Sequence, residues 1–382
     1  MNRWGILALL FTARTVMAMQ YQAIGALSPL LSDRFGIGLA EIGVLIGLYV
    51  APGLVFALPG SAIGQRFGEK PVVVVAAALM AAGAFLMAIT ETWDLFLAGH
   101  LLAGLGGVLV NILMTKMVAD WFVGAEITTA LAIFINSWPF GIALGLVVFP
   151  PLAAAFGVAS AFWLLTALAL SVGMLMALFY RRPADLPVSA GPRVWPQGRA
   201  LKAVLQAGVC WGAFNGGLAI LFGLGTTLLV EKGETPEAAA RATSLILWVL
   251  AVAAPCGGLL ADRTGRGTEM IVVGLIGLAV LSPLALADGL TVPVFLAYGA
   301  VSGLVAGPIM SLPARALTPE MRISGMGLFF TVYYAIFIAA PALAGAVAEI
   351  SGAIAGAFWC AAALQVWALA GLALHKRALR AA

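Results

Sequence analysis

Charged residues are scarce in this 382-residue chain, and that scarcity excludes most soluble folds. Asp, Glu, Lys and Arg together make up 9% of the sequence, whereas hydrophobic residues make up 63%. A soluble protein carries about 25% charged residues, so this chain has too few charges to cover a water-facing surface. The mean hydropathy of +1.08 predicts instead an all-α membrane protein.

Cysteine and histidine are also rare. The three cysteines, Cys210, Cys256 and Cys360, all fall inside apolar runs, so we expect buried, free thiols and no disulfide framework. With two histidines in the chain, we find no metal-ligand cluster, no nucleophile–base pair and no phosphate-binding loop. The sequence therefore predicts a non-enzyme without cofactor or metal. The net charge is +4, and the basic residues are distributed among the loops as membrane topology requires. We therefore predict no nucleic-acid partner.

Apolar runs of about 20 residues, the length that spans a bilayer, recur along the chain. They predict twelve transmembrane helices, at 4–32, 41–62, 71–90, 94–117, 126–152, 159–180, 201–230, 238–261, 269–288, 291–314, 323–349 and 353–375. With the N-terminus inside, sixteen Lys and Arg residues lie on the inner side, and only Arg34, Lys232 and Arg241 lie outside. This bias predicts cytoplasmic N- and C-termini.

The N-terminus allows one alternative. The residues from Met1 to about Ala18 could form a cleaved signal peptide. Cleavage would remove half of the first span and destroy a division into six and six helices, so we expect the first span to be retained.

A short charged loop occurs twice between apolar runs. Residues 258–266 read GLLADRTGR, and residues 61–70 read SAIGQRFGEK. Gly68 and Gly265 are 197 positions apart, about half the chain. The first copy is degraded, because Gln65 replaces the acid and Ser61 replaces the leading glycine.

The pattern G-x-x-x-D-R-x-G-R resembles the signature of the major facilitator superfamily, found there between the second and third helices of each half. The resemblance implies a secondary transporter, monomeric in the bilayer of the cell (inner) membrane, that works by alternating access. It implies two six-helix bundles, residues 1–180 and 201–382, joined by a cytoplasmic linker at 181–200.

The resemblance implies that these loops form a cytoplasmic latch, which stabilises one of the alternating conformations of the transporter. The residues that match are Gln65, Arg66, Gly68, Asp262, Arg263, Gly265 and Arg266. The alternative is that both loops are ordinary solvated basic loops.

Arg14 is the polar residue most out of place. It lies about ten residues into the first span, roughly 15 Å deep at 1.5 Å per residue. Because an arginine is costly against lipid, we expect it to face the bundle interior or a wet cavity. No Asp or Glu falls in the middle of a predicted span, so the sequence offers Arg14 no acidic partner at that depth. A small anionic substrate would supply the opposite charge. The alternative is a structural arginine bonded to the backbone.

The offset of 197 identifies further candidate donors. Arg14 matches Trp211, one turn before Asn215, and Asn136 matches Tyr333. The predicted substrate-binding residues are Arg14, Tyr21, Asn136, Asn215, Tyr333 and Tyr334. The predicted partner is a small anion, with or without a co-transported or exchanged ion. Two alternatives remain open: an exporter of neutral or amphipathic compounds, and a membrane sensor that does not transport.

Two further segments carry family resemblances. The run from His100 to Gly107 resembles the fourth-helix motif R-x-x-x-G-x-G with histidine in place of arginine, so His100 is the candidate proton-linked group. The alternative is a plain hydrogen-bonded histidine. In the run from Asn136 to Gly145, Pro139 removes a backbone hydrogen bond, and Gly141 and Gly145 form a face for close packing. The sequence of that run resembles the cyanate and nitroimidazole transporter branch of the superfamily.

Overall fold

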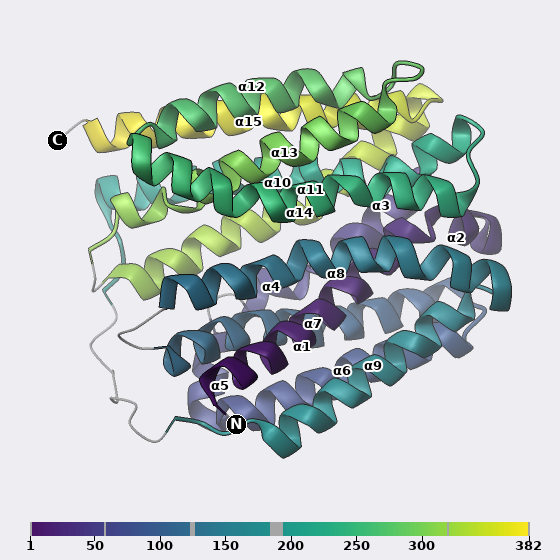
Figure 1. Ribbon diagram of the computed structural model, residues 1–382, viewed down its shortest axis with the longest axis horizontal. Coiled ribbons are helices and arrows are strands. Elements are labelled where there is room, and N and C mark those ends of the chain that lie inside the picture. The colour runs from purple at the N-terminus through teal and green to yellow at the C-terminus, as the bar shows by residue number, and fades with distance from the viewer. Residues whose placement is uncertain (1, 57–58, 123–126, 184–193, 319–320, 381–382) are drawn as a thin grey trace. The chain divides into compact units, whose positions relative to one another are not determined.

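The computed structural model describes residues 2–56, 59–122, 127–183, 194–318 and 321–380, and these fold into helices (Figure 1). The first half contains α1 (Arg3–Ala26), α2 (Ser28–Phe35), α3 (Leu39–Leu48), α4 (Pro52–Phe56), α5 (Gly60–Phe67), α6 (Glu69–Ile89), α7 (Trp93–Trp121), α8 (Ile127–Phe156) and α9 (Ala159–Phe179). The second half contains α10 (Gly198–Glu231), α11 (Pro236–Thr264), α12 (Gly267–Leu284), α13 (Thr291–Met310), a short 3₁₀ turn η1 (Pro313–Arg315), α14 (Arg322–Ser351) and α15 (Ala355–Arg380).

Eleven helical segments among the described residues are long and apolar enough to cross a membrane. The segment Leu39–Phe56 combines α3 and α4, and each of the other ten lies on one of the helices α6 to α15. The 24-residue helix α1 is long enough as well, but it carries Arg14, Gln20 and Gln22 among its apolar residues. With α1 included, the described helices account for the twelve predicted spans.

The chain divides into two compact units. Unit 1 contains residues 1–36 and 48–189, and unit 2 contains residues 37–47 and 190–382. Half of the predicted linker at 181–200, residues 184–193, lies outside the described residues. Helix α3 packs with unit 2, where a Cβ atom on Gly43 would collide with the carbonyl oxygen of Pro341. Only a residue without a side chain allows the two backbones to approach so closely.

The two units repeat one pattern of helix neighbours. In unit 1, α1 packs on α8, and α6 packs on α7 and α9. In unit 2, α10 packs on α14, and α12 packs on α13 and α15. Figure 1 shows α6 running beside α9, and α12 running beside α15. The half-chain offset between the two loop copies thus corresponds to a repeated order of helices.

The first predicted span is not one helix. It breaks at Leu27 because Pro29 has no N–H to donate to the carbonyl of Gly25, four residues earlier. The hydroxyl of Ser28 donates to that carbonyl instead, at 3.1 Å. The second predicted span also breaks, at residues 49–51, just before Pro52 begins α4.

The prediction of buried cysteines is wrong for Cys256. Cys210 is buried, but Cys360 is partly exposed and Cys256 is exposed, and all three are free. The outer surface of a membrane helix faces lipid and is as apolar as its interior. An apolar run therefore identifies a span without showing which of its residues are buried.

Candidate functional site

Arg14 lies near the middle of α1 and holds three helices of unit 1 together. Its Nε donates to Oδ1 of Asn111 on α7 at 3.0 Å. Its Nη1 donates to the backbone carbonyls of Phe134 and Ile135 on α8, each at 3.0 Å, and lies 3.3 Å from the hydroxyl of Ser137. The side chain is half-buried, as an arginine at this depth requires.

Pro139 explains why α8 can accept these hydrogen bonds. In a continuous helix the N–H of residue 139 would donate to the carbonyl of Ile135, but proline has no N–H. The Ile135 carbonyl therefore needs another donor, and Arg14 supplies it. The hydroxyl of Ser137 donates to the carbonyl of Phe134 in the same turn.

Aromatic rings complete the surroundings of the guanidinium. The Cζ atom of Arg14 lies 4.9 Å from the centre of the Phe134 ring and 6.0 Å from that of Trp138. At these distances the ring faces attract a cation. The backbone and the rings of α8 thus both stabilise the positive charge.

The acidic residues lie elsewhere. Every described Asp and Glu is in a loop or among the first or last three residues of a helix. Lys116, five residues before the end of α7, pairs with Glu69 and with Asp120, the latter at 2.6 Å. By contrast, the hydrogen bonds of Arg14 described above run to neutral oxygens. Arg14 thus contributes a positive charge near the middle of α1.

The other predicted site residues of unit 1 occupy two environments. Tyr21 is 1% exposed and packs against the rings of Tyr49 and Trp138, at 5.9 and 5.1 Å. Asn136 is half-buried on α8, between Ile135 and Ser137, and so adjoins the Arg14 contacts.

Asn215, Tyr333 and Tyr334 belong to unit 2. The side-chain amide of Asn215 donates to the carbonyl of Trp211 in its own helix at 2.8 Å. The Tyr333 ring contacts those of Trp211 and Tyr334, at 6.3 and 4.9 Å. Trp211, Tyr333 and Tyr334 form an aromatic cluster between α10 and α14, whereas the hydrogen bond of Asn215 stays within α10.

His100 is fully buried in unit 1. Its ring lies 5.5 Å from that of Tyr49, and the Tyr49 hydroxyl donates to Oε1 of Gln20 at 3.2 Å. The Nε2 of Gln20 in turn donates to the carbonyl of Met80 at 2.9 Å. The candidate proton-linked residue thus adjoins a buried polar chain.

The arginines of the two loop copies lie at the protein surface. Arg66, Arg263 and Arg266 are exposed. Gly265 ends α11 with φ of 65°, a left-handed conformation that favours glycine, and Gly68 has φ of 86° between α5 and α6. The side chains of Gln65 and Asp262 lie outside the described part of the structure.

Asn111 and Ser137 were not among the predicted site residues. A signal for both was present, since each is a polar residue inside a long apolar helix. Pro139 also identifies the Ile135 carbonyl, four residues earlier, as an acceptor without its helical donor. Neither signal identifies the helix from which the donor comes.

Comparison with known proteins identifies the family. The family described as Major Facilitator Superfamily matches residues 10–233, more than half of the chain. The chain belongs to this superfamily. It is therefore a multi-pass membrane transporter.

Individual relatives are distant. The hexuronate transporter of Bacillus subtilis is 21% identical over 95% of this chain and 92% of its own length. The inner membrane transport protein YajR of Escherichia coli is 27% identical over 41% of this chain, which spans 35% of that protein. A bacterial homolog of the human lysosomal transporter Spinster, in an inward-facing and occupied conformation, is similar in structure, with a TM-score of 0.76. It is 13% identical and covers 99% of this chain and 97% of its own, so the likeness shows the fold alone.

Proposed function

We propose that this transporter moves a small anion across the cell membrane by alternating access, and that Arg14 binds the anion. The observation that carries the proposal is the charge at the centre of unit 1. Arg14 contributes a cation there, whereas the described acids lie at helix ends. A guanidinium offers paired donors that match carboxylate-like oxygens.

One relative supports the substrate class. A hexuronate is a carboxylate, and the hexuronate transporter matches nearly the whole chain. In the same proposal, Tyr21, Asn136, Asn215, Tyr333 and Tyr334 supply further contacts, and His100 is the group that would couple transport to a proton. The exposed arginines of the two loops act in the latch, on the cytoplasmic side with both termini.

The hydrogen bonds of Arg14 also favour a second candidate. Because Arg14 donates to the carbonyls of Phe134 and Ile135, it stabilises α8 irrespective of any substrate. In this second function the arginine is structural, and the protein exports neutral compounds.

The variant Asn111→Asp separates the two functions. The new carboxylate still accepts the hydrogen bond from Nε of Arg14, so the structural contact is kept. It also neutralises the guanidinium, so an anion would have to compete with it.

The experiment is uptake into proteoliposomes of labelled cyanate, a labelled hexuronate and a neutral nitroimidazole. We expect anion uptake by the wild type, loss of uptake in Asn111→Asp and Arg14→Ala, and a correctly folded Asn111→Asp protein by size-exclusion chromatography. Thr115→Ser, one turn further along α7, is the matched control and should transport normally. Anion uptake that survives in Asn111→Asp, or uptake of nitroimidazole alone, would overturn the anion proposal.

A further inference from the structure

A small cavity lies near the C-terminal end of α15, among elements of unit 2. Its volume is about 190 Å³, below the roughly 300 Å³ at which pockets for drug-sized ligands begin. Thr268 of α12, Arg315 of η1, and His375, Lys376 and Arg380 of α15 supply its polar groups. A cavity of this size suits a phosphate-sized group.

His375 gives the cavity an unused buried acceptor. The residue is 1% exposed, and its Nδ1 lies 2.7 Å from the carbonyl oxygen of Ala203. Because a carbonyl oxygen only accepts, Nδ1 carries the proton, and Nε2 of the neutral ring is an acceptor. Nε2 is buried and has no hydrogen-bond partner among the described residues. A buried polar atom left in this way is unfavourable, unless a ligand supplies the donor.

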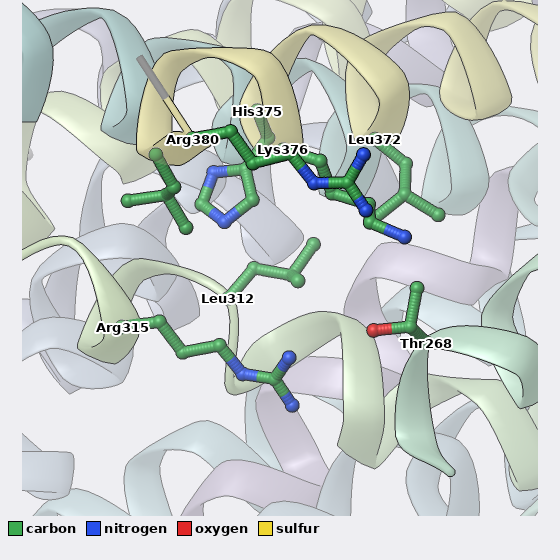
Figure 2. Close-up of a pocket in the computed structure, with 8 residues that line it drawn as sticks. Thr268, Leu312, Arg315, Leu372, His375, Lys376 and Arg380 are labelled. Carbon is green, nitrogen blue, oxygen red and sulfur yellow. The ribbon is translucent and has the colours of Figure 1, made fainter. Parts of the chain in front are cut away.

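Three cations surround the same space. Figure 2 shows His375, Lys376 and Arg380 reaching from α15 into the cavity, with Arg315 and Thr268 across from them. Arg315, Lys376 and Arg380 form no ion pair with any residue that the structure describes. Positive charges thus gather here without a described counter-charge.

The first turn of α12 adds to the positive potential. A Cβ atom on Gly267, the first residue of α12, would lie 3.7 Å from Nη2 of Arg315. The N-terminal end of a helix carries a partial positive charge, so a neighbouring cation is unfavourable there and an anion is favourable. Glu269 is the acid of this turn, but it is exposed and has no ion pair within the described residues.

We propose that this cavity binds a phosphate group, carried either by an anionic lipid head group or by a soluble phosphate compound. Arg315, Lys376 and Arg380 bind the phosphate oxygens, together with the hydroxyl of Thr268. Nε2 of His375 accepts a hydrogen bond from a hydroxyl of the ligand. Leu379, at 36% exposure, provides an apolar side on which a lipid tail or a glycerol backbone can pack.

Binding to the purified, full-length protein in detergent tests the proposal, measured by isothermal titration calorimetry. The ligands are phosphatidylglycerol, glycerol 3-phosphate and inorganic phosphate, with diacylglycerol as the lipid that lacks a phosphate. If phosphatidylglycerol alone binds, the source is a lipid; if the soluble phosphates bind equally well, the source is soluble. Failure of all three phosphate ligands to bind, or equal binding of diacylglycerol, would overturn the proposal.

Two charge-removing variants locate the site. We expect Arg315→Gln and Lys376→Gln each to weaken phosphate binding about tenfold, the effect of losing one charge-assisted hydrogen bond. Arg377→Gln is the matched control, because Arg377 is exposed on α15 and does not line the cavity. An equal loss in Arg377→Gln would show general surface attraction and reject the site.

Folding does not limit this test. Lys376 forms no hydrogen bond with a described residue, so Lys376→Gln leaves the helix contacts intact and decides the question even if Arg315→Gln fails to fold. The readout is independent of transport, so the result is separate from the anion proposal for Arg14.

Discussion

The contact between α1 and α8 in unit 1 and the contact between α10 and α14 in unit 2 are equivalent in the fold but opposite in chemistry. In unit 1, Arg14 donates to α8 next to Pro139. At the same positions, 197 residues on, unit 2 has Trp211 and Ile336. Trp211 contacts Tyr333 ring to ring, at 6.3 Å. One helix pair is held by a charge, and the other by aromatic packing.

The small residues that allow close packing lie on opposite partners in the two helix pairs. In unit 1 they lie on α8, where a Cβ atom on Gly141 would collide with the carbonyl oxygen of Thr15 on α1. In unit 2 they lie on α10, where a Cβ atom on Gly212 would lie 3.0 Å from the Cβ atom of Ile336 on α14. Close approach of the helices needs small residues on one partner only. The fold therefore constrains the helix pair and leaves the chemistry of each side free.

The largest expected effect comes from giving unit 2 the charge of unit 1. In Trp211→Arg the new guanidinium meets α14 where Ile336 keeps its N–H, so the carbonyl of Val332, four residues earlier, keeps its helical donor. A charge at the centre of a membrane helix costs about 3 kcal/mol, so we expect most of the protein to be lost from the folded fraction in size-exclusion chromatography. Trp211→Phe is the control, and equal folding of the two variants would contradict this account.

Removing the charge from unit 1 has the next largest effect. Arg14→Ala removes a hydrogen bond to the carbonyl of Phe134, which keeps the Ser137 hydroxyl, and deprives the carbonyl of Ile135 of its donor. We expect this to lower the free energy of unfolding by about 1–3 kcal/mol. Pro139→Ala restores the N–H for Ile135, so the double variant should recover part of that loss. The measurement is a double-mutant cycle of unfolding in detergent, and strictly additive changes would show that Arg14 and Pro139 are not coupled. Anion uptake should stay absent in the double variant.

A smaller effect tests a feature that the units share. Each buries a tyrosine bonded to a glutamine: the Tyr49 hydroxyl donates to Gln20 at 3.2 Å, and Nε2 of Gln365 donates to the Tyr298 hydroxyl at 3.1 Å. Tyr49→Phe and Tyr298→Phe should each lower the free energy of unfolding by about 0.5–1.5 kcal/mol, measured by thermal unfolding. A large loss in one variant and none in the other would show that the two hydrogen bonds differ in kind.

Much of the fold follows from composition and repetition. The apolar runs locate the helices, and the loop at 61–70 and its copy at 258–266 predict the repeated order of neighbours that the structure shows. The breaks at residues 27 and 49–51 were readable as well, because Pro29 and Pro52 each lack an N–H. The apolar runs alone, however, predict one helix in each place.

The contacts of Arg14 could be predicted only in part. Its depth follows from counting residues, and its need for oxygen partners follows from the cost of a charge in lipid. Its acceptors lie 97 to 123 positions away in the sequence, and one sequence does not give the register between α1 and α8. The same limit applies to Lys116. Its pairing with Asp120, four residues on, follows from helical spacing, whereas its pairing with Glu69 on α6 does not.

The smallest expected effect concerns an asparagine in each unit. Asn111 accepts from Arg14 of another helix, whereas Asn215 donates to the Trp211 carbonyl of its own helix. Asn215→Ala removes a local bond and introduces a better helix former, so the free energy of unfolding should change by no more than about 0.5 kcal/mol. Because stability stays constant, anion uptake by this variant reports on the substrate contact alone. Reduced uptake would assign Asn215 to substrate binding, and unchanged uptake would remove it from the proposed site and leave the charge of unit 1 as the main determinant.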